Sequence, residues 1–304
     1  APLALIGTIE LMVGHLRLMM LGSGTLARFN GVASARDDVL ATVLAINAHS
    51  GRPTPTSAPG PSGYARLVLG LTTILVDCGR PAPLQFSGGA HAGALSFEMS
   101  HGGDMIIVNR GAPAPTHREA KADSRATASH STLALDEQSS SRLVRSRPLE
   151  RLIGGPAIAG PDNVTTSVVE TEDEVHLTAV HDGYYTRFGI LHERRLTLAR
   201  NGQLLAGTDI LRPHAGTLRL SHDLPLAVRF HLPVEATVQA AADGSLVIQP
   251  ERGPPWILTA KGGRLAIEAG TDYAQNQGPS AARQAVVRAA TPGETTVEWQ
   301  LERA

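Results

Sequence analysis

The chain has 304 residues, a length that suits one large domain or two of medium size. Apolar residues make up 42% of it and charged residues 18%, a composition that is typical of a globular protein and excludes an intrinsically disordered one. The 27 basic and 28 acidic residues give a formal net charge of −1, so we expect no nucleic-acid partner. An anionic partner would need a local basic cleft.

The single cysteine and the N-terminal apolar run exclude several further classes of protein. Cys78 is the only cysteine, which excludes an internal disulfide and a cysteine-rich metal site. The compartment stays open, because a disulfide-free protein can function in the cytoplasm or in the periplasm. The apolar run lacks a basic leader and a small-residue cleavage site, so it is not predicted to be a signal peptide. His15 and Arg17 interrupt it too early for a membrane span, which needs about 18 apolar residues.

Residues 1–52 are predicted to form a helical segment. The apolar residues favour a first helix that runs to about Met20, where Gly22 and Gly24 would end it. A second helix is predicted after Ser34, a candidate N-cap residue. Apolar residues then recur at helical spacing, at Val39, Val43 and Ile46.

Residues 53–62 are predicted to form a linker between two domains. This stretch holds four prolines, which remove backbone donors and forbid a helix. Beyond it the sequence changes from helical spacing to short strand-like runs, so residues 63–304 are expected to form a separate domain.

Short runs with strand-like alternation fill this second domain. The runs are residues 64–69, 72–76, 95–99, 105–108, 131–135, 164–169, 175–180, 195–198, 204–210, 218–220, 227–232, 246–248, 257–259, 265–268 and 296–300. Asn201-Gly202, Asp243-Gly244 and Gly262-Gly263 are predicted hairpin turns. Because no long helical pattern intervenes, the predicted fold is mainly β: a large antiparallel β-sandwich preceded by a short helical segment.

Two histidines and an asparagine fall at the edges of three consecutive strand-like runs. His91 lies before the first of these runs, Asn109 at the end of the second and His130 at the start of the third. Neighbouring strands lie about 5 Å apart, so the three side chains can converge on one point. Imidazole and amide groups there could hold one divalent metal, with zinc favoured. Alternatively, neighbouring backbone satisfies the imidazoles and Asn109 caps a turn.

Several motifs occur in an order that carries further information. They are Gly63-Tyr64-Ala-Arg-Leu, Asp77-Cys-Gly79, His91-Ala-Gly-Ala-Leu-Ser-Phe97, Ile106-Ile-Val-Asn109-Arg-Gly111, Ala128-Ser-His130-Ser-Thr132, Asp182-Gly-Tyr184, Ile190-Leu-His-Glu-Arg-Arg195 and Gly207-Thr-Asp-Ile210. This order resembles the β-domain of the heparinase II/III-like polysaccharide lyases. The helical start is compatible with the end of that family's α/α toroid, which implies that most of the toroid is missing from this chain.

The resemblance implies roles for individual residues. Lyases of this family bind a metal in the β-domain through a histidine, an acid and a second histidine. His91 and His130 match the two histidines, while Asn109 stands where the acid is usual. In active members a further histidine, two positions before the first ligand, contributes to catalysis, and Gly89 stands there in this chain. The other catalytic residues come from the toroid, so no catalytic residue is assigned here.

The resemblance also implies a bacterial protein, of the periplasm or the cytoplasm, whose partner is an acidic polysaccharide. The glycan would contain uronate, as in heparin, heparan or a bacterial exopolysaccharide. Arg125 and Tyr184 are candidate substrate contacts. Alternatively, Arg125 is an ordinary solvated arginine and Tyr184 packs across strands. The sequence His192-Glu-Arg-Arg195 is predicted to alternate across the two faces of a sheet as a charged edge.

Three functional hypotheses remain open at this stage. The chain could be the sandwich half of a lyase that performs β-elimination on uronate polymers and is inactive alone. It could be a non-catalytic carbohydrate-binding or structural β-sandwich, which Gly89 and Asn109 favour. It could also be a metal-stabilised β-domain that serves assembly. A basic, aromatic-lined groove beside His91 would favour the first two hypotheses.

Overall fold

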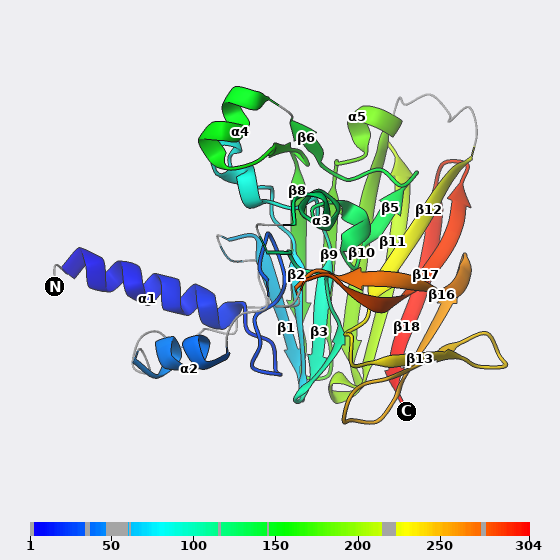
Figure 1. The fold of residues 1–304 in the computed structure, drawn as a ribbon. Coiled ribbons are helices and arrows are strands. Elements are labelled where there is room, and N and C mark those ends of the chain that lie inside the picture. Colours follow the sequence, from blue (N-terminus) through cyan, green and yellow to red (C-terminus); the bar gives the residue numbers. More distant parts are fainter. Residues whose placement is uncertain are drawn as a thin grey trace.

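The computed structural model of the chain has the predicted fold, a β-sandwich preceded by a short helical segment (Figure 1). It describes residues 3–33, 37–46, 60, 62–114, 117–144, 146–214, 223–274 and 278–304. All strand pairings in these ranges are antiparallel. Most of the predicted linker, 53–62, lies outside them, so the domain boundary stays a prediction.

Two helices project from one side of the β-structure in Figure 1: α1 (Leu3–Leu18) and α2 (Asp37–Ile46). Helix α1 ends two residues before the predicted end at Met20, and the candidate cap Ser34 lies outside the described residues. Both helices expose apolar side chains, at Leu5, Ile6, Ile9, Leu11, Met12, Val39, Val43 and Ile46. Within the described ranges, no helix combines the length and apolar character that crossing a membrane requires.

Three sheets build the sandwich. The first has the strand order β1-β2-β3-β4, with β1 (Tyr64–Leu69), β2 (Thr72–Asp77), β3 (Phe97–His101) and β4 (Asp104–Ile107). The second has the order β13-β14-β15-β18-β11-β10-β9-β8, with β8 (Val164–Glu170), β9 (Val175–His181), β10 (Ile190–Ala199), β11 (Leu204–Pro213), β13 (Thr237–Ala240), β14 (Leu246–Gln249), β15 (Trp256–Lys261) and β18 (Thr295–Arg303). The third has the order β16-β17-β12-β5, with β5 (Leu133–Leu135), β12 (Leu224–His231), β16 (Arg264–Asp272) and β17 (Ser280–Thr291).

Smaller elements connect the sheets. A two-stranded ribbon pairs β6 (Arg142–Val144) with β7 (Ala157–Ala159). The remaining turns of helix are short: α3 (Arg118–Ser124), α4 (Arg147–Ile153), α5 (Tyr185–Phe188), η1 (Leu84–Gly89), η2 (Thr127–Ser129) and η3 (Arg200–Gly202).

Two local predictions are wrong. The glycines Gly262-Gly263 do not close a hairpin, because β15 pairs with β14 and β18 while β16 pairs with β17; the turn carries the chain from one sheet to another. The segment around Arg194 is no charged edge, because β10 lies between β9 and β11 and Arg194 is fully buried. The predicted run 218–220 lies outside the described residues.

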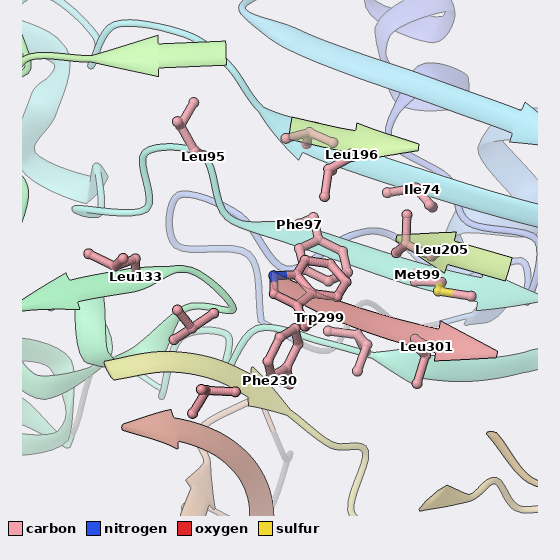
Figure 2. Packing of buried hydrophobic residues seen from close by; sticks show 14 of the residues in the cluster. Ile74, Leu95, Phe97, Met99, Leu133, Leu196, Leu205, Phe230, Trp299 and Leu301 are labelled. Atoms are coloured by element: carbon pink, nitrogen blue, oxygen red, sulfur yellow. The ribbon is translucent and has the colours of Figure 1, made fainter. Parts of the chain in front are cut away.

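One aromatic side chain from each sheet meets at the centre of the core (Figure 2). Trp299 of β18 stacks on Phe97 of β3, with ring centroids 5.6 Å apart and planes 6° from parallel. Phe230 of β12 meets Trp299 edge-on at 4.8 Å. Stacked and edge-to-face pairs are the favoured arrangements of aromatic rings, so this cluster ties the three sheets together.

Gly207 makes room for the Trp299 indole. The two residues are cross-strand partners in β11 and β18. A Cβ atom at Gly207 would lie 2.0 Å from the indole ring, a distance that side chains do not tolerate. The indole Nε1 donates a hydrogen bond of 3.0 Å to Asp209. Only glycine therefore permits this packing.

Candidate functional site

The structure brings His91 and His130 together. His91 follows η1 after a single residue, and His130 follows η2 directly. The loops that carry the two histidines are joined by a backbone hydrogen bond of 2.9 Å from the Ala92 N–H to the Arg125 carbonyl. The pairing that the sequence predicts is therefore present.

The geometry of the pair suits two arrangements. His91 Nδ1 lies 3.2 Å from His130 Nε2, and the rings are nearly perpendicular. Two nitrogens on one tetrahedral zinc, each about 2.0–2.1 Å from the ion, would lie about 3.3 Å apart. The observed separation therefore fits a shared metal as well as a direct hydrogen bond. His130 Nδ1 donates to the Ala126 carbonyl at 2.8 Å, which leaves Nε2 as the lone-pair nitrogen on the side of His91.

Burial keeps both imidazoles neutral. It lowers the pKa of His91 well below the ordinary value, and the neighbouring charges of His130 and Arg125 lower this pKa further. Burial also lowers the pKa of His130 to about 4, although the bond to Ala126 opposes the change. Neutral imidazole is the form that ligates metals, so the pair is ready for a ligand at neutral pH.

Asn109 is fully buried and bonded to Ser131, the residue that follows His130. Its Oδ1 accepts the backbone N–H of Ser131 at 2.8 Å, and its own N–H donates to Glu98 Oε1 at 2.7 Å. The Asn109 Nδ2 and the Glu98 Oε2 have no hydrogen-bond partner among the described residues. One lone pair of Oδ1 remains for a metal, so Asn109 fits at most a weak, neutral third ligand.

The described residues contain no group of three His, Cys, Asp or Glu side chains that could hold a metal ion. His91 and His130 supply two nitrogen donors at a suitable separation. Among the described residues, a third ligand at this place would therefore be uncharged, as Asn109 is. The residues thus fit a metal in part, and the metal site stays a prediction.

A buried arginine holds both histidine loops in place. Arg194 Nη1 donates to the carbonyls of Leu95 and Ser131, at 2.9 Å each. Leu95 has a φ of 57°, a left-handed conformation that costs an ordinary residue about 1–3 kcal/mol and persists only when its surroundings enforce it. Asp209 in turn fixes Arg194 through two bonds of 2.8 and 3.0 Å. The core of the eight-stranded sheet therefore positions the site.

A polar cavity of about 280 Å³ lies beside His91. Asn30 lines it and joins two other lining residues: its Oδ1 accepts the His91 N–H at 2.9 Å, and its Nδ2 donates to the Tyr64 hydroxyl at 2.5 Å. Asn30 has a φ of 47°, which asparagine adopts more readily than most residues. This cavity lies next to one predicted ligand and is open to a small molecule.

Asp77 brings a carboxyl group to the same cavity. It is the cross-strand partner of Tyr64, and its Oδ1 accepts the Gly79 N–H at 3.3 Å. Burial raises the pKa of Asp77 to about 7, although the bond from Gly79 lowers it. Burial, together with the charge of Asp77, also raises the pKa of Tyr64 far above its ordinary value. The cavity therefore holds a carboxyl group that can accept or donate a hydrogen bond near neutral pH.

Arg125 has a structural position. Its side chain is 2% exposed, and it donates to the carbonyls of Ala90 (2.7 Å) and Ser87 (3.0 Å). These bonds hold the loop that leads into His91. A substrate contact for Arg125 stays a prediction, which this geometry does not favour.

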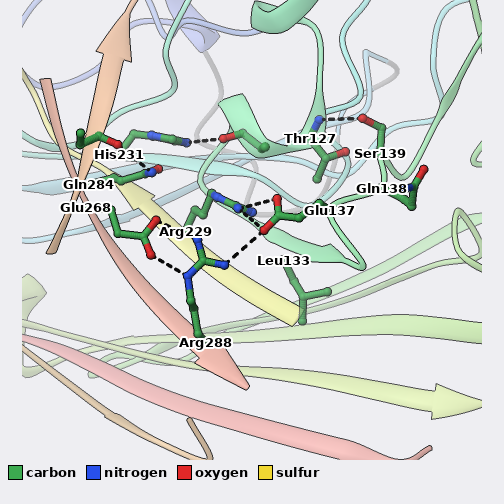
Figure 3. Close-up of polar contacts among 12 residues, drawn as sticks. Thr127, Leu133, Glu137, Gln138, Ser139, Arg229, His231, Glu268, Gln284 and Arg288 are labelled. Atoms are coloured by element: carbon green, nitrogen blue, oxygen red, sulfur yellow. Dashed lines mark hydrogen bonds and ion pairs between the residues drawn. The ribbon is translucent and has the colours of Figure 1, made fainter. Parts of the chain in front are cut away.

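Tyr184 is likewise buried, at 1% exposure, with its hydroxyl donating to the Leu133 carbonyl at 2.9 Å. The chain beyond Leu133 is fixed by ion pairs (Figure 3): Glu137 lies between Arg229 at 2.7 Å and Arg288 at 3.2 Å. These contacts favour a structural role for Tyr184 in supporting β5, and its proposed substrate role stays untested.

Sequence reasoning missed Asn30, Tyr64, Asp77 and Arg80 as parts of the site. A signal was available for two of them, because pairing the runs 64–69 and 72–76 as a hairpin places Tyr64 opposite Asp77. Asn30 and Arg80 lie in irregular segments, where no periodicity marks a residue as facing a cavity.

The family of the chain follows from a comparison with known proteins. The family described as "Heparinase II/III-like, C-terminal" matches residues 51–300. The chain therefore belongs to the heparinase II/III-like C-terminal family, and the resemblance predicted from the motifs is confirmed.

Solved structures share the fold. The heparan sulfate lyase HepC from Pedobacter heparinus superposes with a TM-score of 0.75 and 14% identity, over 99% of this chain and 47% of that one. A heparinase III with methylated lysines superposes with a TM-score of 0.73 and 15% identity, over 100% of this chain and 47% of that one. At these identities the likeness shows the fold alone.

A relative of higher identity is FtsZ-localized protein C from Caulobacter vibrioides. It is 31% identical over 262 residues, which make up 84% of this chain and 43% of the relative. The chain thus spans less than half the length of each of these three proteins.

Proposed function

We propose that the whole protein is a polysaccharide lyase that performs β-elimination on uronate-containing acidic polysaccharides. The observation that carries this proposal is the pair of neutral histidines, His91 and His130, beside a polar cavity in a β-domain of the heparinase II/III-like family. The glycan would be of the heparin or heparan type or a bacterial exopolysaccharide.

The chemistry defines what the site must supply. A uronate lyase neutralises the carboxylate, removes the adjacent C5 proton and protonates the departing C4 oxygen, and each acid or base contributes about 10²–10⁴ in rate. His91 and His130 would hold a divalent metal, with zinc favoured and Asn109 as a neutral third ligand. The metal would neutralise the carboxylate and stabilise the enolate-like charge.

This chain would form one wall of the cleft. The other wall, and the remaining acid and base groups, would come from a toroid domain of the same protein. We therefore expect the 304-residue chain alone to show little or no turnover.

The test is an elimination assay. Elimination creates an unsaturated uronate that absorbs at ~230 nm, so the assay reads the proposed chemistry directly. Full-length protein and the 304-residue chain are incubated with a panel of uronate polymers. The proposal expects product from the full-length protein and at least about 100-fold less from the chain. Absence of product from every polymer would overturn it.

Two observations favour a second candidate, a non-catalytic glycan-binding module. Gly89 offers no side chain at a position where active members of the family carry a histidine, and a Cβ there would meet no atom within 4 Å. Asn109 lacks the charge of the usual acid. Glycan binding without any product in the same panel would support this candidate.

A further inference from the structure

The cavity beside His91 contains polar groups whose bonding is incomplete. The Tyr64 hydroxyl accepts from Asn30, and its own hydrogen has no acceptor among the described residues. The Asp77 carboxyl group accepts one hydrogen bond from the described residues, from the Gly79 N–H at 3.3 Å. Ser141 is 8% exposed, and its buried Oγ has no partner among the described residues.

These three groups are suited to hydroxyl ligands. A carboxyl oxygen accepts, a phenol donates and a serine hydroxyl does either. Buried polar groups are normally paired, so unpaired ones that line a cavity indicate a ligand or water. Three prolines, Pro81, Pro83 and Pro161, supply apolar wall against which the C–H face of a sugar ring can pack.

A positive charge stands at the same cavity. Arg80 lines it and is exposed, and no described residue pairs with its guanidinium. The carboxyl of Asp77 makes its own part of the cavity unfavourable for an anion. An acidic group on a ligand would therefore turn toward Arg80, and its hydroxyls toward Asp77.

We propose that this cavity is a subsite for one uronate unit of the glycan, with Asp77, Tyr64 and Ser141 binding its hydroxyls and Arg80 binding its carboxylate. The inference rests on the proposed function and names the residues that recognise the substrate. The volume of about 280 Å³ is just below the range of about 300–1,000 Å³ for whole ligand sites, and so fits a single sugar unit.

The experiment compares two matched probes on the full-length protein. One is an unsulfated, uronate-containing tetrasaccharide, and the other is the same molecule with its carboxylates reduced to hydroxymethyl groups. Their dissociation constants are measured by calorimetry for the wild type and for Asp77→Asn, Arg80→Gln and Arg264→Gln. The last variant is the control, because Arg264 is an exposed arginine of β16 outside the cavity.

The expected pattern separates the two roles. Arg80→Gln should weaken binding of the uronate probe about tenfold and leave the reduced probe within about twofold. Asp77→Asn should weaken both probes about tenfold, and Arg264→Gln should change neither. Because Arg80 is exposed, its substitution leaves the fold intact and keeps the test decisive even if Asp77→Asn folds poorly.

Three outcomes would overturn the subsite. If Arg80→Gln weakened both probes equally or neither, the carboxylate would not bind there. If Arg80→Gln and Asp77→Asn left binding unchanged while the full-length protein still released unsaturated uronate, the subsite would be wrong and the proposed function would stand. If the wild type bound neither probe and released no product, both would fall.

Discussion

The described residues include two pairs of buried histidines with nearly the same geometry and different surroundings. In the site pair, His91 and His130 lie 3.2 Å apart with rings at 83°. In the core pair, His181 and His192 lie 3.1 Å apart with rings at 87°. Burial is the main cause that lowers the pKa of all four histidines, so all are neutral at pH 7.

The core pair is completely hydrogen-bonded. The Gly183 N–H donates to His181, His181 donates to His192, and His192 donates to Asp209 at 2.8 Å. Asp209 also accepts from Arg194 and Trp299. A polar network in which every group is paired fixes one geometry and stabilises it, and it leaves no group for a ligand.

The hydrogen-bond network of the site pair is incomplete and ends at a cavity. His91 lines that cavity, and its Nε2 has no hydrogen bond to a described residue. Ser141 lines the same cavity, and its Oγ is also unpaired within the described part of the chain. The comparison teaches that the completeness of the surrounding network, more than the histidine pair itself, distinguishes the stabilising core pair from the pair that we propose to be functional.

The largest expected effect comes from breaking the core network. Asp209→Asn keeps the shape but leaves the Arg194 charge buried without a counter-ion, which should lower the free energy of unfolding by about 3–5 kcal/mol. Urea denaturation measures this. Glu302→Gln, at the exposed pair with Arg200, is the control and should cost less than about 1 kcal/mol. Equal, small losses in both variants would contradict the role of the network.

A pH effect should come from Glu98, behind Asn109. Burial raises the pKa of Glu98 from 4.5 to about 7, so the folded state holds a proton that the unfolded state releases between these values. Stability should therefore fall as pH rises from about 4.5 to about 7, by up to about 3 kcal/mol. Burial also raises the pKa of Asp77 to about 7, so Asp77 adds a fall in the same pH range. Glu98→Gln should therefore make the total fall between pH 5 and pH 8 smaller by up to about 3 kcal/mol, as urea denaturation would show. The exposed Glu172→Gln should retain the whole fall.

The core packing gives the next effect. Gly207→Ala would force a methyl group into the Trp299 ring and should cost about 1–3 kcal/mol in the same assay. Gly270→Ala is the matched control in β16, because its Cβ would meet no atom closer than 3.6 Å and should cost under about 1 kcal/mol. Identical costs at the two glycines would show that the indole can move.

How much of this could be read from the sequence differs between fold and site. Alternation and turn residues predicted most strands, because a half-buried sheet repeats every two residues. They could not predict which sheet a strand joins, so the turn at Gly262-Gly263 was misassigned. The site pair was predictable because His91 and His130 flank strand-like runs that lie close together in the sequence, although β3 and β5, which follow them, belong to different sheets. The burial of Arg194 was not, since a charge in a strand ordinarily marks a solvated face and only the tertiary partner Asp209 reverses that.

A smaller effect is expected on metal binding, from a substitution at the proposed third ligand. Asn109→Asp should tighten zinc binding about tenfold, because a charged oxygen would replace the neutral oxygen of the proposed third ligand. Competition with a zinc indicator measures the dissociation constant, and elemental analysis gives the stoichiometry. Asn201→Asp, in the turn between β10 and β11, is the control. No zinc binding by either the wild type or Asn109→Asp would end the metal hypothesis.

The most direct test of the comparison substitutes one histidine of each pair in the full-length protein. His91→Gln should lower the release of unsaturated uronate per folded molecule at least about 100-fold while costing under about 2 kcal/mol of stability. His192→Gln should cost about 2–4 kcal/mol and leave the release per folded molecule within about threefold. An unchanged release in His91→Gln, or an equal loss of release in both variants, would contradict the assignment of the site.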